Sequence, residues 1–258
     1  MIDARAEVDR TAIIAADAHI GPWTIIGPGV EIGAGTRVEA YTMIKGPTVI
    51  GPDNHIHSFC SIGDDPQDKK FDLTEGHSRL EIGSGNTIRE YCSINRGTPG
   101  GGGVTRLGDN NWIMAYCHIA HDCQVGSQTI FANNTTLAGH VEIHDHVILG
   151  GFTGVHQFCR LGEGSFSAIA AIIVRDVPPF LIVKGNTAVP RCINSIGLRR
   201  RGFDAATLAA LKHCYRALYR SGLRLEEALE IVAHEAEACP AARSMLDFIR
   251  ASTRGIVR

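Results

Sequence analysis

The sequence predicts a three-sided parallel β-helix followed by a small helical domain. Three observations lead to this fold class. An aliphatic residue recurs at every sixth position, a small or polar residue often stands two positions before it, and the pattern changes after about residue 176. A period of six fits neither the 3.6-residue turn of an α-helix nor a simple hairpin.

The aliphatic repeat predicts the coils of the β-helix. Three short strands, each with one inward aliphatic side chain, make a coil of 18 residues, and successive coils stack about 4.8 Å apart. Glycine often follows the aliphatic residue, as at Gly21 and Gly27, and we expect it to turn the corners. The alternative is a chance pattern in an ordinary β protein. The repeating positions are Ile2, Val8, Ile14, Ile20, Ile26, Ile32, Val38, Ile44, Ile50, Ile56 and Ile62, then Ile82, Ile88 and Ile94, then Leu107, Ile113, Ile119, Val125, Phe131, Leu137, Ile143, Leu149, Val155 and Leu161.

Two interruptions of the repeat predict loops. They cover residues 63–81 and 95–106, and the second contains the letters RGTPGGGG. Because the period restarts after each interruption, we expect both segments to project from the coils. Long loops on a rigid scaffold often carry function.

The C-terminal quarter of the chain has helical spacing. DVPP, from residue 176, ends the regular coils, and we place the β-helix at 1–190 and the helical domain at 191–258. Asp204 is a candidate N-cap, and the helix after it has an apolar stripe that includes Leu208 and Leu211. A second helix is predicted over 225–238 and a third after Pro240.

Composition excludes several functional classes. The net charge of −2 gives no basic excess that would favour nucleic acid. The N-terminus lacks the features of a signal peptide, and no apolar run is long enough to cross a bilayer. The eight cysteines include no CxxC pair, so we expect reduced core residues in a cytosolic protein. They are Cys60, Cys92, Cys117, Cys123, Cys159, Cys192, Cys214 and Cys239.

Four histidines are predicted to lie along one edge of the β-helix. Residues stack when their numbers leave similar remainders on division by 18, and His118, His121, His140 and His156 leave 10, 13, 14 and 12. They fall on three consecutive coils, within roughly 10 Å. The alternative is a chance group of surface histidines.

This histidine edge allows two chemistries. Zinc would need three or four close ligands. Asp122 directly follows His121, however, and Gln157 follows His156, which fits hydrogen bonding to a polyhydroxyl substrate better than a metal cage. An imidazole with a pKa near ~6.5 can take a proton from a sugar hydroxyl, and a carboxylate can fix its tautomer. The backbone N–H beside Gly139 is a candidate donor to an oxyanion. No serine or cysteine has an obvious nucleophile context, which favours direct transfer.

Several motifs resemble those of one enzyme family. They are AHDC (120–123), NNTTLAGH (133–140), GGFTGVHQFC (150–159), DVPPF (176–180), LRRRGF (198–203) and STRGIVR (252–258). Over essentially the whole chain, these motifs resemble the UDP-N-acetylglucosamine O-acyltransferases. The resemblance implies a left-handed β-helix, a homotrimer with active sites between neighbouring prisms, and transfer of an (R)-3-hydroxyacyl group from acyl carrier protein to the glucosamine 3-hydroxyl. This is the first step of lipid A synthesis, and no cofactor is expected besides the acyl carrier thioester.

The resemblance also assigns roles to individual residues. His121 resembles the general base, Asp122 its neighbouring carboxylate and Gly139 the oxyanion donor. The remaining assignments are substrate contacts. Asp68 and Lys70 resemble residues that hold the sugar and the acyl or pantetheine part; His118, His140, His156 and Gln157 resemble other substrate contacts; Asn194, Arg200 and Arg201 resemble the nucleotide and phosphate grip. Taken alone, LRRRGF would instead predict a solvated basic helix end.

Three positions depart from the family pattern. Thr187 stands where many members have histidine, Ile196 where they have an acidic residue, and Ile169 where long-chain members have glycine. The first two concern the nucleotide contacts. Ile169 predicts a shorter acyl chain, unless its side chain points into the prism and only packs. There are three rival interpretations: an amino sugar as acceptor, the later N-acyltransferase of the pathway, and a non-catalytic or metal-binding β-helix. The N-acyltransferase has an additional N-terminal domain, for which the repeat from Ile2 leaves no room.

Overall fold

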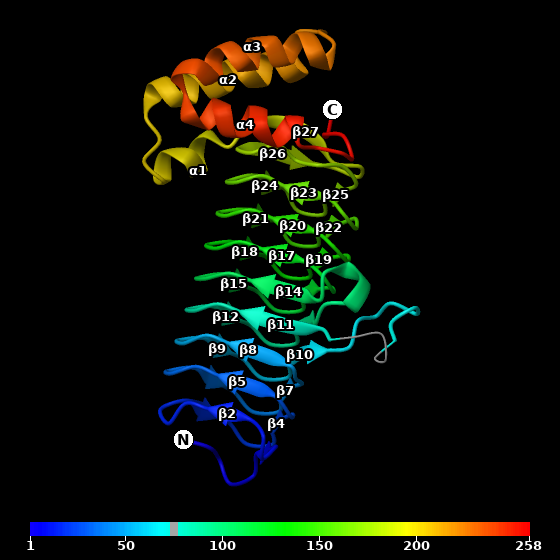
Figure 1. The fold of residues 1–258 in the computed structure, drawn as a ribbon. Coiled ribbons are helices and arrows are strands. Elements are labelled where there is room, and N and C mark those ends of the chain that lie inside the picture. Colours follow the sequence, from blue (N-terminus) through cyan, green and yellow to red (C-terminus); the bar gives the residue numbers. More distant parts are fainter. Residues whose placement is uncertain (73–76) are drawn as a thin grey trace.

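The protein is a left-handed parallel β-helix whose end is covered by four helices, as seen in the computed structural model, which describes residues 1–72 and 77–258 (Figure 1). The predicted fold class is confirmed. Part of the predicted loop 63–81, residues 73–76, lies outside the described residues. Among the described helices, none is both long and apolar enough to cross a membrane.

Three parallel sheets form the sides of the prism, and each coil contributes one strand to each sheet. The first sheet contains β1 (Glu7–Val8), β4 (Ile25–Ile26), β7 (Met43–Ile44), β10 (Ser61–Asp64), β13 (Ser93–Asn95), β16 (His118–Ile119), β19 (Thr136–Leu137), β22 (Gly154–Val155) and β25 (Ile172–Ile173). The second contains β2 (Ile13–Ile14), β5 (Val30–Ile32), β8 (Thr48–Ile50), β11 (Arg79–Ile82), β14 (Val104–Leu107), β17 (Gln124–Val125), β20 (Glu142–Ile143) and β23 (Arg160–Leu161).

The third sheet includes the antiparallel hairpin that ends the prism. Its strands are β3 (His19–Ile20), β6 (Arg37–Val38), β9 (His55–Ile56), β12 (Thr87–Ile88), β15 (Trp112–Ile113), β18 (Ile130–Phe131), β21 (Ile148–Leu149), β24 (Phe166–Ser167), β26 (Leu181–Lys184) and β27 (Val189–Ile193). Because β26 still stacks in parallel on β24, the coil continues beyond DVPP, which was expected to end it.

The aliphatic repeat fills the interior of the prism. Ile44, Ile62, Ile94, Ile119 and Leu137 are stacked in the first sheet, and each is at most 1% exposed. Burial of a full aliphatic side chain contributes about 1.5–3 kcal/mol, so the repeat is the main source of stability.

The prediction that glycines turn the corners was wrong for most of them. The left-handed backbone falls three residues after the aliphatic residue, for example at Trp23 (φ 54°) and Asp122 (φ 60°). Glycine directly after the aliphatic residue instead lets coils approach closely, because a Cβ on Gly33 would lie 2.6 Å from the carbonyl carbon of Gly51.

Two corners of the prism differ in what they carry. The loop corner, where the chain passes from the first to the second sheet, contains both interruptions of the repeat. The aromatic corner, where it passes from the third sheet to the first, carries a stack of exposed rings with centroids about 5 Å apart. The stacked rings are Trp23, Tyr41, Phe59, Tyr91 and Tyr116, at centroid separations of 5.1, 5.3, 5.1 and 4.9 Å.

Four helices cover the C-terminal end of the prism (Figure 1). They are α1 (Ser195–Arg200), α2 (Ala205–Tyr219), α3 (Leu225–Ala238) and α4 (Pro240–Arg250). Asp204 caps α2 as predicted, by accepting a hydrogen bond from the backbone N–H of Thr207. The end of α1 contains residues 198–200 of LRRRGF, which taken alone predicted a basic helix end, whereas its start at Ser195 was not predicted. Seven of the eight cysteines are buried, and the core expectation was wrong for Cys192, which is exposed on a strand at the prism's end.

Candidate active site

The loop corner brings the candidate residues together on consecutive coils. The first loop, residues 65–78, joins β10 to β11; the second, residues 96–103, joins β13 to β14; and the short turn 120–123 joins β16 to β17. The same corner recurs on each coil. The two loops therefore leave the prism from the coils that precede the turn that carries His121 and Asp122. The predicted loop bounds included the starts of β11 and β14, which are strands.

His121 and Asp122 form a hydrogen-bonded pair in this turn. Nδ1 of His121 lies 2.8 Å from Oδ2 of Asp122, whose side chain has no exposed surface. Thr98 of the second loop donates to the same carboxylate twice, from its backbone N–H to Oδ1 at 2.9 Å and from its hydroxyl to Oδ2 at 2.7 Å. The backbone N–H of Asp122 donates to the hydroxyl of buried Thr105. Three hydrogen bonds from His121 and Thr98 therefore hold the carboxylate, and Thr105 holds the backbone of the same residue.

The ionisation of Asp122 fixes the tautomer of His121. Burial raises the pKa of Asp122, but the hydrogen bonds from His121 and Thr98 outweigh this effect and hold the pKa below its usual range. An ionised carboxylate only accepts, so Nδ1 of His121 must donate, and in the neutral ring Nε2 carries the lone pair. Among the described residues Nε2 has no hydrogen-bond partner. The pair thus presents a basic nitrogen with a fixed orientation.

Glycines allow the backbone to pass close to this pair. A Cβ on Gly139 would lie 2.7 Å from Nε2 of His121, and one on Gly101 would lie 2.2 Å from Oδ2 of Asp122 and 2.6 Å from Cε1 of His140. Contacts this short are forbidden for a side-chain carbon. The peptide backbone beside Gly139 therefore lies next to the basic nitrogen, where an oxyanion donor is needed.

His140 is the second histidine close to Asp122. Its Nε2 lies 3.7 Å from Oδ2 of Asp122, and its ring stacks on Phe158 with centroids 4.6 Å apart. Burial lowers the pKa of His140, and the facing carboxylate offsets this only in part. His140 is therefore neutral at neutral pH and suited to hydrogen bonding.

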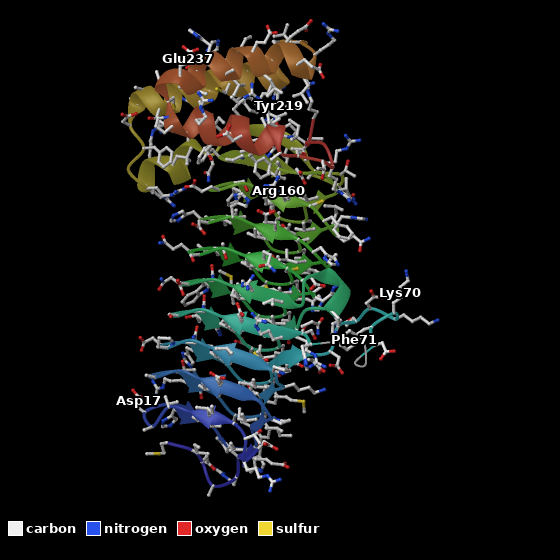
Figure 2. All side chains as sticks on the ribbon, in the orientation of Figure 1. Asp17, Lys70, Phe71, Arg160, Tyr219 and Glu237 are labelled. Atoms are coloured by element: carbon white, nitrogen blue, oxygen red, sulfur yellow. The ribbon has the colours of Figure 1, made fainter. Side chains whose placement is uncertain are left out.

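A cavity of about 250 Å³ opens beside His140, between the two loops. Asp68 and Lys70 of the first loop line one side, and residues 98–101 of the second loop line the other. Figure 2 places Lys70 and Phe71 on the part of the first loop that projects from the prism. An acidic and a basic side chain beside a histidine offer both acceptors and donors to a polyhydroxyl ligand.

The other two predicted histidines lie on either side of the pair. His118 faces outward from β16, where Nδ1 lies 2.8 Å from Oγ of Ser93, and burial, then the neighbouring His121, lower its pKa. His156 and Gln157 are exposed two coils further along. Nδ1 of His156 accepts a hydrogen bond from Arg254 of the C-terminal segment at 2.9 Å.

The three predicted nucleotide contacts are not part of this cavity. Asn194 and Arg200 line a second, mostly apolar cavity of about 490 Å³ on the outer face of the third sheet. Arg201 points elsewhere, because it forms an ion pair with Glu163 and lies over the ring of Phe203. Within one chain, the histidines and the Asn194 cavity therefore occupy different faces.

The three departures from the family pattern are all at the surface. Ile196 lines the cavity of Asn194, so an apolar side chain replaces an acidic one there. Thr187 lies in the turn between β26 and β27 and is exposed. Ile169 is 72% exposed at the aromatic corner, which contradicts the alternative that it points into the prism.

One group of the described residues could hold a metal ion. His121, Asp122 and His140 each offer a ligand atom, all within 4.8 Å of one another. However, Oδ2 of Asp122 already accepts from His121 and Thr98, and Nδ1 of His121 points at the carboxylate. Binding at about 2.0–2.2 Å would break these hydrogen bonds, so the arrangement favours acid–base chemistry.

The sequence analysis did not identify Thr98, Ser93 or Arg254. Thr98 lies in an inserted loop, where the hexad period assigns no position. Ser93 pairs with His118 in adjacent strands of the first sheet, but the second loop lies between them, so their numbers leave different remainders and the stacking rule does not find the pair. Arg254 comes from the C-terminal segment, whose contact with His156 no local pattern predicts.

Comparison with known proteins gives consistent matches along the chain. Residues 176–257 match a family model described as UDP N-acetylglucosamine O-acyltransferase, domain 2, and residues 11–46 and 105–139 match bacterial transferase hexapeptide repeats. The acyl-[acyl-carrier-protein]--UDP-N-acetylglucosamine O-acyltransferase of Janthinobacterium sp. (strain Marseille) is 52% identical over 262 residues, covering 100% of this chain and 99% of the relative. That of Alkalilimnicola ehrlichii is 52% identical over 257 residues, with the same coverage. The crystal structure of Francisella novicida UDP-N-acetylglucosamine acyltransferase, 43% identical, matches with a TM-score of 0.97 over 100% of this chain and 94% of that chain.

Proposed function

The chain belongs to the family of acyl-[acyl-carrier-protein]--UDP-N-acetylglucosamine O-acyltransferases, and we propose that His121 is the general base of its reaction. The protein is an acyltransferase of lipid A biosynthesis that transfers an acyl group from acyl carrier protein to UDP-N-acetylglucosamine. The observation that carries the proposed role is the fixed pair of His121 and buried Asp122, which leaves Nε2 available beside the backbone of Gly139.

The proposed reaction is a direct transfer. Nε2 of His121 takes the proton of the glucosamine 3-hydroxyl as the oxygen attacks the thioester carbonyl of an (R)-3-hydroxyacyl carrier protein. The N–H at Gly139 donates to the oxyanion that forms. The C–S bond then breaks, the imidazolium returns its proton to the leaving thiolate, and the products are the ester and the free carrier thiol. Asp122 stabilises the imidazolium, and no step needs a cofactor.

Substrate positions follow from the two cavities. The cavity lined by Asp68 and Lys70 is beside His140, so we assign it to the sugar and the adjoining acyl or pantetheine group. His118, His156 and Gln157 extend this surface along the first sheet. We assign the cavity of Asn194 and Arg200 to the nucleotide, because a guanidinium group pairs well with phosphate. Arg201 supports that cavity through its ion pair with Glu163.

A homotrimer would bring the two cavities together. In a closed ring each chain presents one face to one neighbour and a different face to the other, so the first sheet of one chain would meet the third sheet of the next. The aromatic corner, which lies between these two sheets, would then point at the axis. Its exposed rings support this arrangement, as do the ion pairs Arg106–Glu81 and Arg160–Glu142 on the second sheet, which would remain in solvent.

Complementation tests the shared site. His121→Ala and Arg200→Ala chains should each be impaired alone and should regain activity when they are assembled together. Random association leaves about a quarter of the interfaces with a native His121 from one chain and a native Arg200 from its neighbour. Full activity in a monomer, or no recovery in mixed trimers, would contradict a site built from two chains.

Product analysis tests the reaction itself. UDP-N-acetylglucosamine and a panel of 3-hydroxyacyl carrier proteins should give a product that is heavier by one acyl group in mass spectrometry. Release of the acyl group by mild base identifies an ester on this acceptor. An amino acceptor is tested in parallel with the 3-amino-3-deoxy analogue of the sugar nucleotide, whose acylated product would be an amide that resists mild base. Absence of product with every carrier would refute the function.

The chain's place in lipid A synthesis also leads us to assign it to the cytoplasm, where its carrier protein is available.

A further inference from the structure

Arg96 lies buried at the base of both loops and contacts two other segments of the chain. Its NH2 group lies 2.5 Å from Oδ1 of Asp65, and NH1 donates to the carbonyl of Gly46 at 3.3 Å. The guanidinium carbon lies 5.6 Å from the centre of the Phe71 ring. Only 9% of the residue is exposed. One side chain therefore joins β13, the turn before β8 and the first loop.

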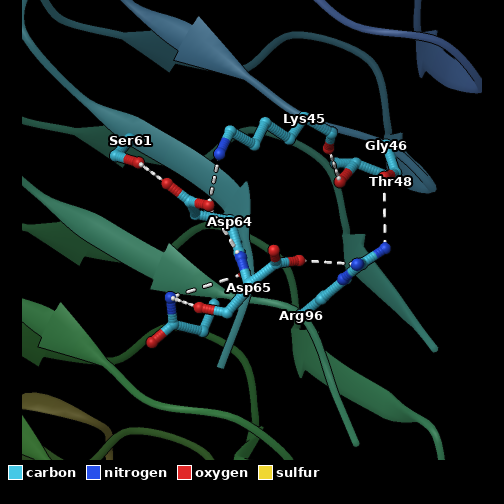
Figure 3. A network of polar contacts seen from close by, with 8 residues as sticks. Lys45, Gly46, Thr48, Ser61, Asp64, Asp65 and Arg96 are labelled. Atoms are coloured by element: carbon cyan, nitrogen blue, oxygen red, sulfur yellow. Dashed lines mark hydrogen bonds and ion pairs between the residues drawn. The ribbon is translucent and has the colours of Figure 1, made fainter. Parts of the chain in front are cut away.

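Backbone and side-chain contacts around Arg96 hold the start of the first loop (Figure 3). The N–H of Arg96 donates to the carbonyl of Asp64 at 3.0 Å, and the side chain of Asn95 donates to the carbonyl of Asp65 at 2.9 Å. Lys45 forms an ion pair with Asp64 at 2.6 Å. The loop therefore leaves the prism in a defined direction.

Phe71 connects the guanidinium to the residues that line the cavity. Its N–H donates to the carbonyl of Asp68 at 2.9 Å, and the N–H of Lys70 donates to the side chain of Asp68 at 2.9 Å, which closes a tight turn. Moving the Phe71 ring would therefore move Asp68 and Lys70. Two residues after Arg96, Thr98 holds the carboxylate of Asp122.

We propose that Arg96 is a positioning residue that sets the substrate-binding wall of the first loop relative to the His121–Asp122 pair. This inference rests on the proposed function of the cavity. Arg96 does not itself line the cavity, but it contacts Phe71, which does. It acts through Phe71 and Asp65 on one side and through the backbone to Thr98 on the other.

Stability alone does not account for an arginine here. Asp65 is 47% exposed, and ion pairs with so solvated a partner contribute little to stability. Within the described part of the chain, Nε of Arg96 is buried without a hydrogen-bond partner, which is unfavourable. Unsatisfied buried groups of this kind often mark functional positions.

Steady-state kinetics of Arg96→Met and Thr98→Val separate positioning from general structural damage. Arg96→Met should raise KM for UDP-N-acetylglucosamine about tenfold with kcat within about twofold, because it releases the binding wall but not the pair. Thr98→Val should lower kcat, because it releases Asp122. Arg89→Met, which removes a half-buried pair with Glu90, is the matched control and should change neither constant.

A double variant tests the coupling. Asp65→Asn should reproduce much of the rise in KM, and the Arg96→Met/Asp65→Asn protein should be no worse than Arg96→Met, since both remove one contact. Should Arg96→Met fail to fold, Arg96→Lys keeps the charge near Asp65 but loses the planar contact with Phe71, and should show a smaller rise. An unchanged KM in a folded Arg96→Met protein would overturn the role. So would changes in kcat and KM in Arg89→Met that equal those in Arg96→Met. Lack of transfer by the native protein would instead refute the proposed function.

Discussion

The loop corner and the aromatic corner have the same backbone and different content. Tyr116 at the aromatic corner has φ 65°, and Asp122 at the loop corner has φ 60°; each stands three residues after a buried aliphatic residue. At the aromatic corner rings stack coil on coil, and the repeat is regular. At the loop corner two loops interrupt the repeat, and the next turn carries a carboxylate fixed by one of them. The regular repeat places His121 and Asp122, and the two loops that interrupt it hold the carboxylate and line the cavity.

The largest expected effect at the loop corner is that of His121→Ala. Turnover should fall by about 10²–10⁴, because the general base is lost, while folding and assembly persist, since the side chain lies outside the prism core. Asp122→Asn should be slowed less, because the base remains. The matched control is His144→Ala, which removes a histidine paired with Glu142 on the second sheet. Near-normal turnover of a folded His121→Ala protein would exclude the mechanism.

A smaller loss is expected when the second loop is pushed away from the pair. In Gly101→Ala the new methyl group would meet Asp122 at 2.2 Å and His140 at 2.6 Å, so the loop must shift. Misplacement of catalytic groups by about 1 Å can lower the rate by about 10²-fold, and we expect a decrease in kcat of about 10- to 100-fold.

Gly100→Ala is the control for this substitution. The Cβ of residue 100 would meet no atom within 4 Å, so kcat should remain close to that of the native protein. Equal kcat values for the two alanine variants would show that the close approach of Gly101 has no part in positioning the pair.

The same contrast explains what the sequence could predict. Ile94, Ile119 and Leu137 obey the period of six, and their burial and stacking follow from counting. The closeness of His121, Asp122 and His140 follows in the same way, because all three lie on regular coils. Arg96 and Thr98 lie where the count stops, and their contacts depend on loop paths that no period describes. The start of α1 was missed for a similar reason, since six residues are too few to establish a helical pattern.

At the aromatic corner the largest functional effect should come from Ile169→Gly. Ile169 is 72% exposed and lies 48 residues beyond His121, which is a little under three coils, or roughly 13 Å. If an acyl chain runs along the groove between prisms, the isoleucine side chain shortens the groove. Each buried methylene contributes about 0.8 kcal/mol, so two more methylenes would shift preference by roughly tenfold.

Carrier proteins with acyl chains of graded length measure this preference. The Ile169→Gly protein should prefer a longer chain than the native protein, as judged by kcat/KM. The substitution Ile13→Ala, on the outer face of β2 in the second sheet, removes an exposed isoleucine side chain away from the predicted groove and should leave the preferred chain length unaffected. The same preference in native and Ile169→Gly proteins would reject the blocking role.

The smallest expected effect is that of breaking the aromatic stack while keeping its backbone. Tyr91 stacks on Phe59 and Tyr116 at 5.1 and 4.9 Å. Asn134 already occupies the corner position on the next coil after Tyr116 with φ 64°, so Tyr91→Asn preserves the left-handed conformation that asparagine tolerates. Each aromatic pair contributes about 0.5–1.5 kcal/mol beyond its buried area, so the free energy of unfolding should fall by about 1–3 kcal/mol.

The control is Gln128→Asn, at the corner between the second and third sheets with φ 58°. It removes no stacked ring and should lower the free energy of unfolding, measured with denaturant, much less. Because the aromatic corner lies away from His121, kcat of the folded protein should be unchanged; a selective loss of kcat in Tyr91→Asn would show that this corner takes part in catalysis as well as in stability.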